Sequence, residues 1–212
     1  MDTILVMAAH PSDLVLGAGG TLAKYAREGK HIVTVVFSYG EGTDPVKEPI
    51  DVIATRIKEF KKATGLLGIR DTIFLSLSDL KFTSDIDEPS TKKKVEDILG
   101  RYKPKIIFTH RADDPHPAHK ATSKFVKEIL HRLKLKPKVY MFAGYVPFRF
   151  GSKAEPSLVV DVTEYYKTKL AAVKFFKSQK PIIDIVAALS NMACWLAGFK
   201  ARCKYAEAFD AA

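Results

Sequence analysis

The chain alternates short apolar runs with longer segments that have helical spacing, and this alternation constrains its fold most strongly. Segments with charged faces and helical spacing lie between the runs, at residues 17–29, 50–66, 89–102, 117–134 and 164–177. The runs are rich in β-branched residues and lie at residues 3–9, 32–37, 72–76, 105–109, 138–142 and 157–160. Runs without polar alternation are typical of strands buried on both faces of a parallel sheet. The pattern therefore predicts an α/β fold, a Rossmann-like three-layer domain with a mostly parallel sheet.

A chain of 212 residues without internal repeats or a low-complexity linker fits one domain spanning residues 1–212. The segment from Pro181 to Phe199 is apolar enough to raise the question of a membrane span. Asp184, Ser190 and Asn191 interrupt it, which favours a buried helix or a subunit contact over a span. We therefore expect no membrane span and regard a homo-oligomer as possible.

The net charge of +10 is compatible with a polyanionic partner, or with a surface that is simply rich in lysine. A dinucleotide fingerprint is absent, because Leu22 stands where the third glycine after Gly17 and Gly19 should fall. A basic protein that binds nucleotide or RNA remains an alternative, but no nucleic acid is expected. Two cysteines and an N-terminus without a basic signal region favour the reducing cytoplasm.

Two histidine-containing loops follow apolar runs. His10 and Asp13 follow the first run, and the later loop holds His110, Asp113, Asp114, His116 and His119. Because ligands bind beyond the carboxyl ends of parallel strands, both loops are expected at one site. Two histidines and one aspartate are a typical catalytic zinc set with an open fourth position. The alternative is structural: His10 ends the strand and Asp13 caps the following helix.

Several motifs together resemble the LmbE-like, or PIG-L, family of zinc de-N-acetylases. Ala9-His10-Pro11-Ser12-Asp13, followed by Gly17 and Gly19-Gly20, is similar to that family's Ala-His-Pro-Asp-Asp-Glu loop. Asp114-Pro115-His116-Pro117-Ala118-His119 is similar to its Asp-x-His-Pro-Asp-His motif. Further similarities follow in family order over nearly the whole chain, at Arg56-x-x-Glu59, Asp161-Val162-Thr163, Ser178-Gln179 and Glu207-Ala208-Phe209.

The resemblance implies a role for each matching residue. His10, Asp13 and His119 match the ligands of Zn²⁺ or another divalent metal, and His116 matches a catalytic histidine that stabilises the oxyanion or protonates the leaving amine. Arg56 and Asp114 match residues near the substrate. The implied reaction is attack of metal-bound hydroxide on the acetamide of an N-acetylglucosamine-type amino sugar, which is the expected small-molecule partner.

Two departures from the family pattern fall on the chemistry. Ser12 occupies the position of the general base, and Ala118 replaces the aspartate that orients a neighbouring histidine. Leu14 replaces a less directly involved glutamate. A positioned general base contributes about 10²–10⁴ in rate, so reduced or altered activity is expected.

Three readings follow from these departures. In the first, another carboxylate takes over as the base, with Asp113 or Asp114 nearest in the sequence. In the second, the chain is a catalytically silent relative that binds zinc and sugar. In the third, it is a variant inactivated by substitution. The sequence leaves all three open.

Overall fold

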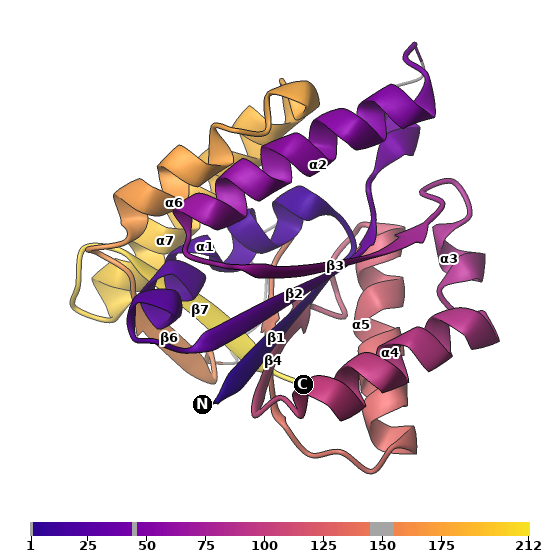
Figure 1. Cartoon of the computed structure of the whole chain (residues 1–212). Helices are drawn as coiled ribbons and strands as arrows, with labels where there is room; N and C mark the ends of the chain where they lie inside the picture. Colours follow the sequence, from indigo (N-terminus) through magenta and orange to yellow (C-terminus); the bar gives the residue numbers. More distant parts are fainter. Residues whose placement is uncertain (1, 44–45, 145–154) are drawn as a thin grey trace.

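Five neighbouring parallel strands form most of a seven-stranded sheet in the computed structural model, which describes residues 2–43, 46–144 and 155–212. β7 lies next to β5 and runs antiparallel to both β5 and β6, and β6 is the edge strand on that side. The strands are β1 (Thr3–Ala8), β2 (His31–Ser38), β3 (Asp71–Leu77), β4 (Ile106–His110), β5 (Lys138–Phe142), β6 (Leu158–Asp161) and β7 (Ala206–Ala211). Their order in space is β3-β2-β1-β4-β5-β7-β6 (Figure 1). The expected mostly parallel sheet is confirmed.

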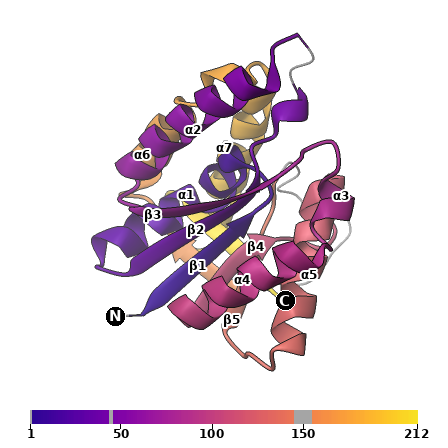
Figure 2. The same cartoon turned by 45° about the vertical axis from the view of Figure 1, so that its right-hand side comes forward.

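Helices cover both faces of the sheet and make it the middle of three layers (Figures 1 and 2). One face carries α1 (Pro11–Arg27), α2 (Pro49–Leu66), α6 (Tyr166–Val173) and α7 (Ile182–Lys200). The other face carries α3 (Phe82–Asp85), α4 (Pro89–Tyr102) and α5 (Pro117–Arg132). Two 3-10 turns, η1 (Glu41–Thr43) and η2 (Lys177–Gln179), lie in the connections.

The apolar run in β1 follows from burial on both of its faces. Ile4 and Val6 pack into the core beneath α1, α2 and α6, whereas Leu5 and Met7 pack into the core beneath α4 and α5. All four side chains are buried. A central strand of a doubly covered sheet has no solvent-facing side, so no polar alternation is required.

Several elements differ from the sequence prediction, and three of them are described here. α1 begins at Pro11 rather than at residue 17, so the first histidine loop is itself the start of a helix. β7 was not expected, because Ala206–Ala211 has only one large apolar residue, Phe209. The helix expected over 181–199 is present as α7, but few of its residues are buried and its outer side is exposed.

The strand order creates a switch point between β1 and β4. From β1 the chain adds β2 and β3 on one side, and it later adds β4 and β5 on the other. Connections therefore leave the carboxyl ends of β1 and β4 in opposite directions, which opens a crevice for a ligand. His10 follows β1 and His110 ends β4, so both histidine loops lie at this crevice.

Candidate metal centre

The first histidine loop forms the N-terminus of α1, which positions the side chains of His10 and Asp13. His10 is the N-cap residue of α1 in extended backbone conformation, and Pro11 occupies the first helical position. Asp13, three residues into the motif, accepts a hydrogen bond from the His10 backbone N–H at 2.8 Å. The capping role considered for Asp13 is thus present, and it holds the carboxylate beside the His10 ring.

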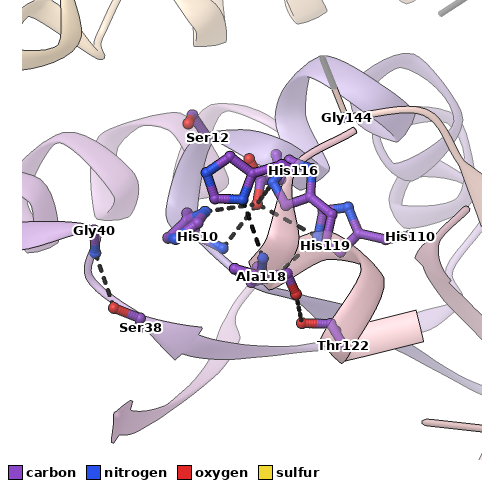
Figure 3. A network of polar contacts seen from close by, with 12 residues as sticks. His10, Ser12, Ser38, Gly40, His110, His116, Ala118, His119, Thr122 and Gly144 are labelled. Atoms are coloured by element: carbon purple, nitrogen blue, oxygen red, sulfur yellow. Dashed lines mark hydrogen bonds and ion pairs between the residues drawn. The ribbon is translucent and has the colours of Figure 1, made fainter. Parts of the chain in front are cut away.

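The second loop builds a comparable helix start at α5. His116 is its N-cap residue, and Nδ1 of the ring accepts the Ala118 backbone N–H at 3.2 Å. Asp114 accepts the backbone N–H groups of His116 at 3.0 Å and Gly144 at 2.9 Å. These bonds fix the loop so that His119, in the first turn of α5, points into the crevice (Figure 3).

The two loops meet at the Asp13 carboxylate. Its Oδ2 lies 3.4 Å from Nδ1 of His10 and 3.2 Å from Nε2 of His119. His116 stands beside both rings, with ring centroids 5.3 Å from His10 and 4.5 Å from His119 (Figure 3). Residues far apart in the sequence therefore converge in a buried cluster of nitrogen and oxygen donors.

The outer nitrogens of the two ligand-type histidines each face a carboxylate. Nε2 of His10 lies 2.9 Å from Oδ1 of Asp79, and Nδ1 of His119 lies 2.9 Å from Oδ1 of Asp114. Metal-ligating histidines commonly donate their remote N–H to a carboxylate, which fixes the tautomer and directs the other lone pair at the metal. The donor set of His10, Asp13 and His119 therefore fits a divalent metal with an open position.

His110 is a third histidine next to Asp13, with its Nε2 3.4 Å from Oδ2 of Asp13. Two groups have donor atoms close enough together to hold a metal ion: Asp13 with His110 and His119, and His10 with His116 and His119. Its Nε2 accepts the Ala9 backbone N–H at 3.0 Å, which engages the ring lone pair that faces Asp13. Burial, and then the neighbouring His119, lower the pKa of His110 to about 4, so the ring is neutral. It stacks on His119 with ring centroids 4.0 Å apart. His110 supports the cluster rather than adding a ligand.

The ionisation of Asp13 and His119 is coupled. Burial raises the pKa of Asp13, but His119 and His10 outweigh burial and hold that pKa well below its usual range. Burial also lowers the pKa of His119, but Asp13 and Asp114 outweigh it and raise that pKa to about 9. In the metal-free protein a proton on His119 balances the carboxylate. A divalent cation at the same place would displace that proton.

Two side chains of α2 hold the walls of the crevice. Arg56 donates through Nη1 to the backbone oxygens of Tyr39 at 3.0 Å and Gly40 at 2.7 Å, which fixes the loop after β2. Glu59, one turn later, accepts the Ser178 backbone N–H at 2.8 Å and its hydroxyl at 2.6 Å. Residues three apart share a helix face, so one face of α2 anchors two loops.

The other residues predicted for the site have contacts within the protein. Oγ of Ser12 donates to Oε1 of Gln179 at 2.9 Å, and Ser12 lies to one side of the histidines (Figure 3). The carboxylate of Asp113 is paired with Arg111 through two bonds and is half-exposed. Asp114 is engaged by His119 and by two backbone N–H groups. Neither acid is therefore placed as a substitute base, and the substrate contact expected of Arg56 and Asp114 stays a prediction.

Sequence reasoning missed Asp79, the contact of Gln179 with Ser12 and the supporting role of His110. Asp79 follows β3 in the segment Ser78-Asp79-Leu80, which has no ligand spacing to mark it. Its one available signal was position, because the end of β3 lies at the same sheet edge as the ends of β1 and β4. His110 sits at the end of a buried strand, where a histidine is costly without partners.

A sheet covered on both faces, with a histidine–carboxylate cluster at its switch point, places the chain in the class of α/β proteins with metal-type donors at the carboxyl ends of their strands. The sequence profile of the PIG-L family, described as GlcNAc-PI de-N-acetylase, matches residues 5–130. The chain belongs to this family.

Individual relatives extend the similarity beyond residue 130. The probable N-acetyl-alpha-D-glucosaminyl L-malate deacetylase 2 of Bacillus anthracis is 27% identical over 186 residues, covering 83% of this chain and 80% of that protein. The structure of N,N'-diacetylchitobiose deacetylase from Pyrococcus horikoshii has a TM-score of 0.82 at 23% identity, covering 100% of this chain and 84% of that one.

The same fold also occurs with another activity. GalB from Pseudomonas putida, a 4-carboxy-2-hydroxymuconate hydratase, has a TM-score of 0.82 at 22% identity, covering 100% of this chain and 96% of that one. At these identities the structural likeness defines the fold alone. The reaction has to be argued from the site.

Proposed function

We propose that the protein is a metal-dependent hydrolase that removes the acetyl group from an N-acetylated amino sugar, with slow turnover. Membership of the de-N-acetylase family and the sugar deacetylases among its relatives support the substrate class. Metal dependence is supported by the convergence of His10 and His119 on Asp13. Asp79 and Asp114 contact the remote nitrogens of the two histidine rings. Zn²⁺ is the ion that this donor set favours.

His10, Asp13 and His119 would hold the ion, which would polarise the acetamide carbonyl and activate water. His116 would donate a hydrogen bond to the oxygen of the same carbonyl. Because its Nδ1 accepts the Ala118 N–H, the neutral ring carries its proton on Nε2. Burial, followed by His119 and His10, lowers the pKa of His116, so the ring is neutral near pH 7. Nε2–H can therefore donate to the developing oxyanion.

The missing general base accounts for slow turnover. Ser12 cannot accept a proton near neutral pH, and its hydroxyl is bonded to Gln179. Asp113 and Asp114 are engaged elsewhere, as described above. A proton released during attack would then pass to solvent, with the loss of about 10²–10⁴ in rate that a positioned base supplies.

Acetate release from zinc-loaded protein tests the proposal, with N-acetylglucosamine, its malate glycoside and diacetylchitobiose as substrates. We expect slow release that a chelator abolishes and that Asp13→Asn removes together with the bound metal. The metal content of each sample, measured by elemental analysis, separates loss of metal from loss of catalysis. Zinc-replete protein that releases no acetate from any of these sugars would contradict a hydrolase.

A silent metal- and sugar-binding protein is the second candidate, and the Ser12–Gln179 bond together with Ala118 favours it. This candidate predicts that the zinc-loaded protein binds N-acetylglucosamine, measured by calorimetry, without turnover.

A cytoplasmic location is part of either proposal and is supported by Cys194 and Cys203, both of which are free thiols.

A further inference from the structure

The outer side of α7 carries a continuous apolar stripe. Its residues recur at helical spacing, and the exposed fractions are 57% for Ile182, 62% for Ile185, 47% for Met192, 54% for Trp195 and 75% for Phe199. Positions three, four and seven apart share one side of a helix, so these side chains form a single surface. We call these five residues the α7 stripe.

The opposite side of α7 is packed on the protein. Ile183, Val186, Cys194 and Gly198 are buried, and α7 contacts α1 and β7. By length and composition α7 is apolar enough to cross a membrane. Crossing would require this packed side to leave α1 and β7. These contacts instead keep α7 packed on the domain, with the side chains of the stripe exposed.

The size of the stripe marks it as a contact surface. Five large side chains exposed by about half to three quarters present roughly 400–600 Å² of apolar area. A patch of this size matches the largest one that a typical monomer exposes, and such patches are often functional. The flanking charge then decides between the possible occupants.

Basic residues surround both ends of the stripe. Between residues 164 and 205 the chain has eight basic and two acidic residues. The exposed Lys177 and Lys180 precede α7, while Lys200, Arg202 and Lys204 end or follow it. Asp184 is the acid within α7, and it lies 3.6 Å from Lys180. A second copy docked on the stripe would bring these like charges together, at a cost in free energy.

We propose that the α7 stripe binds the surface of a membrane that contains anionic lipids. Apolar side chains between clusters of lysine and arginine match such a surface, because the stripe enters the acyl boundary while the cations meet lipid phosphates. The inference does not depend on the proposed deacetylation, since it uses no residue of the metal cluster.

The single tryptophan of the chain, Trp195, reports directly on the stripe. Full-length protein is mixed with vesicles of phosphatidylcholine alone or with about one third phosphatidylglycerol. We expect a blue shift of Trp195 emission and co-sedimentation only with the anionic vesicles, both weakened at high salt. Unchanged emission and no co-sedimentation with anionic vesicles would overturn the proposal.

Two variants test the residues. Phe199→Glu is expected to lower the vesicle partition coefficient at least tenfold while Trp195 remains available as the probe. Ile50→Glu, at the 69%-exposed Ile50 on α2, is the matched control and should partition as the parent does. Circular dichroism confirms that both fold. If light scattering instead gives a dimer that Phe199→Glu dissociates, and vesicles bind both variants equally, the occupant is a second copy and the proposal fails.

Discussion

The Asp79 carboxylate lies 2.9 Å from Nε2 of His10, so the turn after β3 fixes the ring that follows β1. Burial raises the pKa of Asp79, but contact with His10 and the nearby Arg56 outweigh burial and hold that pKa below its usual value. Asp79 is therefore ionised and can orient His10 through a charged hydrogen bond. It is the counterpart of Asp114 behind His119.

Asp79→Asn is expected to weaken metal binding by about 10–100-fold, the usual effect of losing a carboxylate behind a ligating histidine. Competition with a zinc-sensitive chelator dye measures the affinity. Asp97→Asn is the matched control, because Asp97 pairs with Lys93 on the exposed side of α4 and should leave affinity unchanged. Equal affinities for the two variants would show that Asp79 does not support His10.

Metal binding is expected to release protons. The pKa of His119 is raised to about 9 in the metal-free protein, so at pH 7 the ring carries a proton that the metal must displace. Affinity should rise about tenfold per pH unit until the pH passes that pKa, and then level off. His10, whose pKa is also raised, steepens the dependence at lower pH.

Calorimetry in buffers of different ionisation enthalpy counts the protons that leave. We expect one to two per metal at pH 7 and fewer above the pKa of His119. An affinity that is flat with pH would mean that His119 is neutral before the metal binds.

Restoring the two acids should raise turnover. Ser12→Asp supplies a base and should increase kcat by about 10²–10⁴. Ala118→Asp adds a carboxylate near His116 and should contribute about 10–100-fold more. Gln179 has to rotate so that its amide N–H₂, rather than Oε1, faces the new carboxylate. Ser12→Asn, nearly isosteric with the aspartate but unable to act as a base, is the control and should gain no activity.

Replacing one partner of the buried Lys169–Glu207 pair is expected to destabilise the domain strongly. Nζ of Lys169 lies 2.8 Å from Glu207, whose carboxylate also accepts the Gly20 and Thr21 backbone N–H groups of α1. Lys169→Met leaves that charge buried and should lower the free energy of unfolding by about 3–5 kcal/mol in urea titrations.

Lys93→Met, in an exposed pair, is the control for Lys169→Met and should change the free energy of unfolding far less. Equal effects of the two variants would show that burial of the Lys169–Glu207 pair carries no additional penalty.

Local features of the sequence were sufficient for most of the fold. The central strands were predicted within a residue or two, because continuous apolar runs have few alternatives to a buried parallel strand. The grouping of the two histidine loops was also predictable, since each follows a strand and parallel strands end at one edge. β7 and the early start of α1 were not predictable from local features. β7 depends on pairing with β5 and β6, and the start of α1 depends on the cap formed by His10 and Asp13.

The sequence by itself determined the α/β class, the histidine and carboxylate donors of both loops and the absence of an acid at Ser12. These are properties of residue type and short-range spacing. Only the tertiary structure decided that Asp79 lies behind His10, that the His110 lone pair is taken by Ala9, and that the α7 stripe faces outward. Each of these depends on which strands and helices become neighbours, and strand order is set by packing over the whole chain rather than by any local segment.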